Sequence, residues 1–375
     1  MKKSILFIIP SLIAGGAERT LINLLKRIDY SLYQIDLLVV LNQGKYLNEV
    51  PHQVELITLF NNRFFVRILS YLQKKIGFIY VYKYVISRRL TKNYDIGISF
   101  LDSNYTDLLF LYEGITKRYT WVHASYKNYN NYYKYYSNKN YREKLIRNRY
   151  RPLDGIFFVS NDAMNDFIDI FGEYPNMRVI YNVIDTDRIR RMALEDISFT
   201  NDIFTFVSIG SLIPVKGFDR LIRAAKIVTD RGYRFKLLIL GAGPVYKKLR
   251  GLIAALHLKS TVDLVGFVSN PYPYLNRGDI FIMSSLTEAL PTVLCEAMVI
   301  GKPVLVTNCS GCREIVANGE FGLVADQDDI DLANKMIEYL SNSDIVDRYR
   351  KKSIERSVIF DDNRIMSEYY KIFDA

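Results

Sequence analysis

Short runs of apolar residues alternate along the chain with stretches in which apolar residues recur every three or four positions. Nine apolar runs predict strands, at residues 5–9, 35–40, 95–101, 155–160, 204–210, 236–241, 262–267, 279–285 and 303–307. Most are almost continuously hydrophobic, which is typical of strands buried on both faces of a parallel sheet. Residues 217–232 show a helical pattern, with apolar side chains on one face. The alternation predicts a doubly wound α/β architecture.

The strand and helix pattern begins twice, which indicates two domains. The first set of strands ends within residues 179–191, and the polar stretch 193–202 precedes a new strand. We therefore expect a first domain at 1–190 and a second at 191–355. Residues 356–375 are expected to form a helix that packs back on the first domain. A length of 375 residues suits two ordinary domains.

The net charge of +10 is concentrated in the first half of the chain. Residues 1–200 hold 28 basic and 19 acidic residues, a net charge of +9. Such a charge favours an anionic partner, namely a membrane surface, phosphates or nucleic acid. No nucleic-acid motif accompanies it, so we do not expect nucleic acid as the partner, although basic patches with aromatic residues do bind single strands.

Residues 61–93 contain eight basic residues and no acidic one. An apolar stripe lies among them, formed by Phe64, Phe65, Ile68, Leu69 and Leu72, beside Arg67, Lys74 and Lys75. This pattern indicates a helix that lies on a membrane, and the Tyr- and Lys-rich residues 125–144 add aromatic rings suited to a headgroup layer. The alternative is a core-packing helix with a solvated basic face. We expect docking on an anionic cytoplasmic leaflet.

The N-terminal residues MKKSILFIIP resemble a signal peptide, but no small-residue cleavage site follows and Glu18 and Arg19 arrive at once. We therefore predict a buried first strand. No apolar run reaches the roughly 18 residues that span a bilayer, so the expected location is cytoplasmic, peripheral on the inner face of the membrane. Cys309 and Cys312 form a C-x-x-C, but zinc would need two further ligands. Reduced thiols are the expectation.

Two glycine-bearing loops follow predicted strands. Gly15 and Gly16 precede a helix that is expected to begin near Ala17, and they leave backbone N–H groups open to an anion. Lys216, beside Gly217, follows the first strand of the second domain, at the sheet edge where ligands of α/β folds bind. A lysine there suits a phosphate. The alternatives are a tight turn without a ligand and a solvated surface lysine.

The stretch TEALPTVLCEAM, residues 287–298, places two glutamates around a proline. Pro291 suits the first position of a helix that runs to about Ile300. The free N–H groups of Thr292 and Val293 can take a diphosphate. Glu288 and Glu296 would then accept hydrogen bonds from hydroxyl groups on either side of that diphosphate. Alternatively, Glu288 interacts only with the helix dipole and Glu296 is simply exposed.

These segments resemble a known family. GGAER, GSLIPVKGFDRLI, GAGP, VDLVGFV, NPYPYL, SSLTEALPTVLCEAM and GKPVLVTNCSGCREIV stand in the order and spacing of the retaining glycosyltransferases of family 4, of the bacterial surface-glycan type. The resemblance covers essentially the whole chain. It implies the GT-B fold, in which two Rossmann-like domains face each other across a cleft. It also implies that the acceptor binds the first domain and the nucleotide sugar the second.

The resemblance assigns roles to residues of the candidate site. Glu296 would bind the ribose and Glu288 the transferred sugar, while Lys216 and Gly16 would bind the diphosphate. Phe267 would lie near the base, and His123 would contact the donor sugar, although a histidine in the core, bonded to backbone, is the alternative for His123. The loop that surrounds the donor is completed by Ser211, Ala289, Leu290, Pro291, Thr292 and Val293. The expected catalytic residues are His123, Glu288 and Lys216.

The chain departs from the family pattern at three places. Ser211 stands where the family often has an arginine that contacts phosphate, and Arg313 is a candidate replacement. Ala289 stands in place of a glycine, so the backbone there must suit a residue with a Cβ. CSGC replaces the more common glycine pair. The first departure places the phosphate site in question.

The expected activity is transfer of a sugar, with retention, from a nucleoside diphosphate sugar to a glycan acceptor. A UDP-sugar is favoured as donor and a lipid-linked glycan as acceptor. No cofactor or metal is expected, and the D-x-D at 185–187 is interpreted as structural. Two alternatives stay open: a nucleotide-sugar epimerase of the same fold, and a non-catalytic partner subunit, which Ser211 would indicate.

Overall fold

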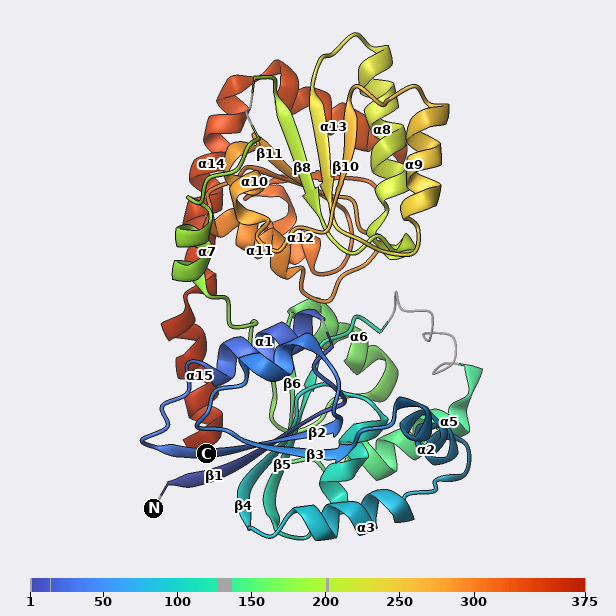
Figure 1. Cartoon of the computed structure of the whole chain (residues 1–375), viewed down its shortest axis with the longest axis vertical. Helices are drawn as coiled ribbons and strands as arrows, with labels where there is room; N and C mark the ends of the chain where they lie inside the picture. Colours follow the sequence, from blue (N-terminus) through green and yellow to red (C-terminus); the bar gives the residue numbers. More distant parts are fainter. Residues whose placement is uncertain (1, 14, 127–136, 200–201, 375) are drawn as a thin grey trace. The chain divides into compact units, whose positions relative to one another are not determined.

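The computed structural model describes residues 2–13, 15–126, 137–199 and 202–374, and the chain forms two compact units (Figure 1). Unit 1 comprises Met1–Val183 and Asn363–Ala375, and unit 2 comprises Ile184–Asp362. The boundary therefore lies seven residues before the expected 190/191. The reason is helix α7 (Thr186–Met192), which packs against α10 (Tyr272–Arg277) and α11 (Thr292–Val299) of unit 2.

Unit 1 contains a parallel sheet of seven strands in the order β3-β2-β1-β4-β5-β6-β7. A helix or a helical turn follows each strand, which provides the crossover connection that parallel strands need. The strands are β1 (Lys3–Ile9), β2 (Tyr33–Leu41), β3 (Glu55–Phe60), β4 (Tyr94–Ser99), β5 (Ile115–Val122), β6 (Gly155–Phe158) and β7 (Met177–Val179). The helices include α1 (Gly16–Leu25), α2 (Arg63–Ile76), α3 (Tyr80–Arg89), α5 (Lys139–Leu145) and α6 (Asn161–Phe171), with shorter turns η1 (Lys45–Glu49), η2 (Asn104–Phe110) and η3 (Ile146–Tyr150).

The last helix of the chain, α15 (Asp362–Asp374), completes the core of unit 1. The Tyr369 ring stacks on Trp121, with ring centroids 5.1 Å apart, and Phe373 packs edge-on against Phe7. The Tyr33 hydroxyl donates a hydrogen bond of 2.7 Å to Asp374 Oδ1. The helix that precedes it, α14 (Ser343–Ser357), belongs to unit 2, so the expected boundary at residue 355 cuts through a helix.

Unit 2 contains a parallel sheet of six strands in the order β10-β9-β8-β11-β12-β13. Helices α8 (Phe218–Asp230) and α13 (Asp329–Ser341) pack together over the core of this sheet. The strands are β8 (Thr205–Ile209), β9 (Lys236–Leu240), β10 (Val262–Gly266), β11 (Ile280–Met283), β12 (Val304–Thr307) and β13 (Leu323–Ala325). The remaining elements include α8 (Phe218–Asp230), α9 (Tyr246–Ala255), α12 (Cys312–Ile315), α13 (Asp329–Ser341), η4 (Pro214–Lys216), η5 (Ala317–Gly319) and η6 (Val358–Phe360).

Both sheets confirm the predicted α/β class, and all nine predicted strands are present. The pattern missed β3, β5, β7 and β13. Strand β5 contains Lys117 and Arg118, which interrupt the apolar run, and β3 begins with two exposed residues, Glu55 and Leu56. Strands β7 and β13 are three residues long and lie at sheet edges. Such segments carry little hydrophobic signal because one face or one edge stays in water.

Candidate active site

Lys216 and Glu288 meet at the point in unit 2 where the strand order reverses, between β8 and β11. Ligands of open α/β sheets bind at such a point, beyond the carboxyl ends of the strands. Lys216 Nζ lies 2.6 Å from Glu288 Oε1, and their side chains are only 20% and 14% exposed. Ser285 Oγ donates a second hydrogen bond of 2.7 Å to the same oxygen. The carboxylate is therefore held by two donors from two loops.

The loop that carries Lys216 is locked to the loop after β11. Ser284 Oγ donates to the backbone oxygen of Lys216 at 2.9 Å, and the N–H of Leu286 donates to Val215 O at 2.8 Å. Gly217 adopts φ 63°, and a Cβ there would lie 2.1 Å from Ser284 O. Only glycine allows this close approach, which explains the glycine after Lys216.

Helix α11 begins at Thr292, one residue later than expected. Pro291 has φ −78° and ψ 91°, so it caps the helix instead of forming its first turn. Within the described residues no side chain caps this end, which leaves the first N–H groups, including those of Thr292 and Val293, for another acceptor. Leu290 and Pro291 are buried, and Glu296 lies half-buried one turn after Thr292.

The two other departures from the family pattern have a structural explanation. Ala289 is not among the residues with positive φ, so its backbone tolerates a Cβ. Gly311, in CSGC, has φ 73°, and a Cβ there would lie 2.7 Å from Ala289 O and 2.9 Å from Glu288 O. The absence of a side chain at Gly311 therefore allows its backbone to pack closely against the loop that carries Glu288. Cys309 and Cys312 are free, buried thiols, and the hydrogen bond that the Cys312 thiol makes to Cys309 raises the pKa of Cys312, as does burial.

Three further predicted residues lie on the surface of unit 2. Ser211 and Arg313 are exposed, and Phe267 is 69% exposed. Ser211 follows β8 and Phe267 follows β10, so both lie at the carboxyl edge of the sheet that also carries Lys216. Arg313 lies on α12, two residues from the supporting Gly311. The roles of all three residues stay predictions.

In unit 1, the N-terminus of α1 differs from the open anion site that we expected. The helix begins at Gly16, and the Glu18 carboxylate lies against Gly15, where a Cβ would be 2.0 Å from Glu18 Oε2. Burial raises the pKa of Glu18, while backbone N–H groups of Glu18 and Gly15 oppose the shift. Gly16 itself is exposed, with no described atom within 4 Å of a Cβ position. A diphosphate at this helix end would have to share it with Glu18.

His123 follows β5, at the carboxyl edge of the sheet of unit 1. Burial lowers its pKa to about 3, against an opposing hydrogen bond with the Phe100 backbone. Nε2 is buried and has no partner among the described residues, so the Phe100 bond uses Nδ1. The imidazole is therefore neutral near pH 7 and presents an unsatisfied Nε2. The alternative interpretation, a core histidine bonded to backbone, explains the hydrogen bond of Nδ1 but not the buried Nε2 without a partner among the described residues.

The D-x-D at 185–187 lies at the start of α7. Asp185 caps this helix by accepting a hydrogen bond of 3.1 Å from the Arg188 N–H, and Asp187 is exposed. Throughout the described ranges, no three His, Cys, Asp or Glu side chains lie where they could together hold a metal ion. Likewise, within those ranges no helix has the length and apolar character needed to cross a membrane.

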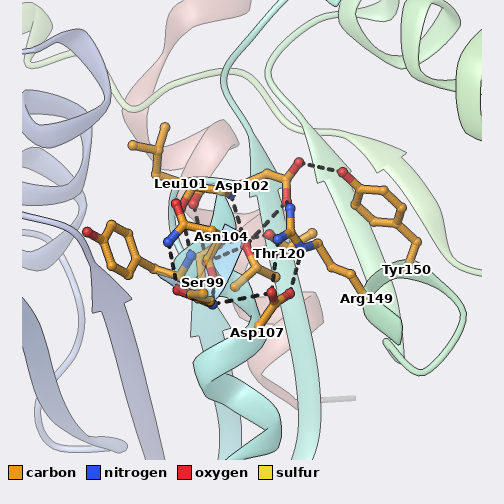
Figure 2. Close-up of polar contacts among 12 residues, drawn as sticks. Ser99, Leu101, Asp102, Asn104, Asp107, Thr120, Arg149 and Tyr150 are labelled. Atoms are coloured by element: carbon orange, nitrogen blue, oxygen red, sulfur yellow. Dashed lines mark hydrogen bonds and ion pairs between the residues drawn. The ribbon is translucent and has the colours of Figure 1, made fainter. Parts of the chain in front are cut away.

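Sequence reasoning missed a polar network in unit 1, which Figure 2 shows. Asp102, whose side chain is 3% exposed, accepts hydrogen bonds from the Tyr126 and Tyr150 hydroxyls. Asp107 binds Arg149 through two bonds of 2.7 and 3.1 Å. These residues come from the loop after β4, the loop after β5 and η3. No spacing within the sequence indicates such a cluster, because its members meet only in the folded sheet.

Comparison with known proteins agrees with this architecture. Residues 194–356 match the family described as Glycosyl transferases group 1, and residues 14–188 match Glycosyltransferase Family 4. The Anabaena protein HepE, solved in complex with UDP and glucose, is 18% identical, with a TM-score of 0.75 over 99% of both chains. That similarity shows a shared GT-B fold.

Two curated relatives match over part of their length. One is the N-acetylgalactosamine-N,N'-diacetylbacillosaminyl-diphospho-undecaprenol 4-alpha-N-acetylgalactosaminyltransferase of Campylobacter jejuni, 32% identical over 60% of this chain and 62% of that protein. The other is an uncharacterized glycosyltransferase of Methanocaldococcus jannaschii, 29% identical over 53% of this chain and 57% of that protein. The matched segment therefore spans less than two thirds of either relative. Taken together, the two parallel sheets, the loops at their carboxyl edges and the two matching models show that this chain belongs to the group 1 glycosyltransferases of family 4, with the GT-B fold.

Proposed function

We propose that the protein is a retaining glycosyltransferase that moves a sugar from a UDP-sugar to a lipid-linked glycan in bacterial surface-glycan assembly. The observation that carries this proposal is the Lys216–Glu288 pair, held at the strand-order reversal of unit 2 beside the uncapped start of α11. The HepE complex with UDP supports the donor class, and the name of the Campylobacter relative supports a lipid-linked acceptor.

In the proposed mechanism, negative charge develops on the departing diphosphate. Lys216 and the N–H groups of Thr292 and Val293 stabilise this charge, which is usually the largest catalytic contribution. Glu288 binds hydroxyl groups of the transferred sugar, and Glu296 binds those of the ribose. Retention arises by reaction on one face, with the leaving phosphate accepting the proton of the acceptor hydroxyl. No metal ion and no carboxylate nucleophile takes part, so a covalent glycosyl adduct on Glu288 would contradict this mechanism.

His123 contributes a neutral imidazole in this proposal. With Nδ1 bonded to the Phe100 backbone, Nε2 carries the lone pair and accepts a hydrogen bond from a hydroxyl group of the donor sugar. A neutral imidazole suits this role because it can orient the donor sugar by a hydrogen bond. The negative charge of the diphosphate is then left for Lys216 to balance.

We further propose that the protein docks on the inner leaflet of the cytoplasmic membrane through α2 and α3. Large apolar side chains are exposed along these helices, namely Phe64, Phe65, Ile68, Tyr71, Ile76, Tyr80 and Tyr84. Basic residues surround them and no acidic residue lies between 61 and 93, which complements an anionic leaflet. The predicted stripe needs one correction: Leu69 is 3% exposed and packs in the core, because α2 has two apolar faces.

The predicted aromatic segment 125–144 adds nothing to this argument, since residues 127–136 lie outside the described part of the chain. The helix predicted within 61–93 is in fact two helices. Gly77, with φ 71°, ends α2 in a left-handed cap before α3 begins.

Calorimetric titration of UDP, GDP and ADP with EDTA present tests the donor site. We expect UDP to bind most tightly, and Glu296→Ala to weaken binding about tenfold by removing the ribose contact. Glu338→Ala, which removes a carboxylate from the surface of α13, serves as the matched control and should bind like wild type. Tighter binding of another nucleotide, a requirement for a divalent cation, or an unchanged Glu296→Ala affinity would each contradict the proposal.

A further inference from the structure

A cavity of about 330 Å³ lies in unit 1 at the second strand-order reversal of the molecule, between β1 and β4. Its wall includes Pro10 and Ser11, which follow β1, Leu41 at the end of β2, and Tyr105 in the turn after β4. The remaining wall is one side of α2. The cavity thus occupies the position in unit 1 that Lys216 and Glu288 occupy in unit 2, where α/β sheets bind ligands.

Helix α2 presents three different faces. Val66, Leu69 and Gln73 are buried against the sheet, while Phe64 and Ile68 are exposed. Between these faces runs a row of basic residues that line the cavity, namely Arg63, Arg67 and Lys74. At 3.6 residues per turn the three fall on one side of the helix.

Among the residues that the structure describes, none neutralises the two arginines of this row. Neither Arg63 nor Arg67 forms an ion pair with a residue that the structure describes. Like charges four positions apart repel each other on a helix, so a bound anion would relieve the repulsion between Arg63 and Arg67. By contrast, Arg19 pairs with Glu49, and Arg149 pairs with Asp107.

The polar network of Figure 2 shows that the nearby carboxylates of Asp102 and Asp107 are already bound by other groups and not by Arg63 or Arg67. Asp107, which follows Tyr105 by two residues, is bound by Arg149, and Asp102 accepts from tyrosine hydroxyls. The same network fixes α2. Gln73 Nε2 donates to Asn104 O at 2.6 Å, and Asn104 Nδ2 donates to Gln73 Oε1 at 2.8 Å. The basic row is therefore held in place before any ligand binds.

We propose that this cavity binds the phosphate or diphosphate group through which the acceptor is attached to its lipid. The guanidinium groups of Arg63 and Arg67 form paired hydrogen bonds with phosphate oxygens, and three residues that carry hydroxyl groups, Ser11, Ser70 and Tyr71, also line the cavity. The exposed Phe64 and Ile68, on the adjacent face, place the lipid side of the acceptor next to the membrane. The lipid source of the anion rests on the proposed transferase function, whereas the anion site itself does not.

The test measures binding of inorganic pyrophosphate to the full chain by calorimetry, with Lys216→Ala present in every protein to remove the predicted donor phosphate contact. We expect Arg63→Gln/Arg67→Gln to bind pyrophosphate about tenfold more weakly. Arg88→Gln/Arg89→Gln removes two exposed charges from the same basic segment, outside the cavity. This control should bind pyrophosphate as the parent does. Equal losses in both variants, or no loss in either, would overturn the inference.

Two further measurements separate the sources of the effect. Binding to phosphatidylglycerol vesicles should fall equally in the two double variants, because both remove two charges. If only Arg63→Gln/Arg67→Gln lost vesicle binding and its pyrophosphate binding stayed intact, the proposed anion site in the cavity would be overturned. UDP binding, measured with Lys216 intact, should be unchanged in Arg63→Gln/Arg67→Gln. If the protein bound pyrophosphate as expected but bound no nucleotide, the proposed anion site would stand and the proposed donor site would be rejected.

Discussion

Lys216 and Glu288 form a half-buried ion pair that depends on both partners. Lys216→Met leaves the Glu288 carboxylate, 14% exposed, without its cation. We expect this to lower the free energy of unfolding by about 1–2 kcal/mol, less than a fully buried pair would lose. Adding Glu288→Gln should recover about 1 kcal/mol, since no unpaired charge remains. Urea denaturation of the two single variants and the double variant measures this coupling, and additive effects would contradict it.

His123 makes the stability of the protein depend on pH. Its pKa is about 3 in the folded chain and about 6.5 when unfolded. Between these values the unfolded chain binds a proton that the folded chain does not, so stability is complete above about pH 6.5 and falls as the pH decreases. From pH 7.5 to 5.5 we expect wild type to lose about 1 kcal/mol more than His123→Gln. Equal losses in urea denaturation at both pH values would contradict this.

At the level of single residues, the sequence predicted the positions of candidate site residues better than their contacts. Lys216, Glu288 and the glycine after Lys216 were found from motif and position, because a loop after a strand must lie at the sheet edge. The bond between Lys216 and Glu288 was not predicted, nor was the Glu18 carboxylate at the start of α1. Both depend on side-chain positions that the spacing of residues leaves open.

The two apolar faces of helix α2 are expected to have different roles: the exposed face binds the membrane and the buried face stabilises the fold. Phe64, 72% exposed, should matter only for the membrane, so Phe64→Ser should weaken binding to phosphatidylglycerol vesicles about tenfold. Its stability should stay within about 0.5 kcal/mol of wild type. Leu69→Ala should behave in the opposite way, losing about 3 kcal/mol of stability with unchanged vesicle binding. Vesicle sedimentation and urea denaturation distinguish the two variants, and similar vesicle binding by Phe64→Ser and wild type would contradict membrane docking through α2.

The elements that the sequence missed share one physical property. Strands β3, β5, β7 and β13 carry charged residues or stand at an edge of their sheet, so burial does not demand a continuous apolar run. The amphipathic pattern of α2 has a related ambiguity. Two apolar faces on one helix give a single broad stripe, and only the sheet decides that Leu69 is inside and Phe64 outside.

For the whole molecule, the C-terminal helix decides whether unit 1 can fold. Helix α15 buries Ile365, Met366, Tyr369, Ile372 and Phe373 in that unit. Each such side chain contributes about 1.5–3 kcal/mol, and their sum approaches the whole stability of a domain. We expect residues 184–361 alone to fold cooperatively and residues 1–183 alone to remain unfolded. Thermal melts followed by circular dichroism test both fragments.

The control for this prediction restores the missing helix. Joining Val183 to Asn363 through a flexible linker recreates the composition of unit 1 and should recover a cooperative transition. A cooperative transition in residues 1–183 without α15 would show that its contacts with Trp121 and Phe7 are dispensable.

The sequence by itself determined the two parallel-sheet domains, nine of their strands, the loops that carry Lys216 and Glu288, and the helix that carries Glu296. These features depend on local periodicity and on glycine and proline at fixed positions, which act through neighbouring residues. Only the tertiary structure decided that Gly311 supports the Glu288 loop, that Asp107 is bound by Arg149, and that Arg63 and Arg67 line a cavity beside the end of β1. In each case the partners are far apart in the chain and meet because strand order brings their loops to one sheet edge.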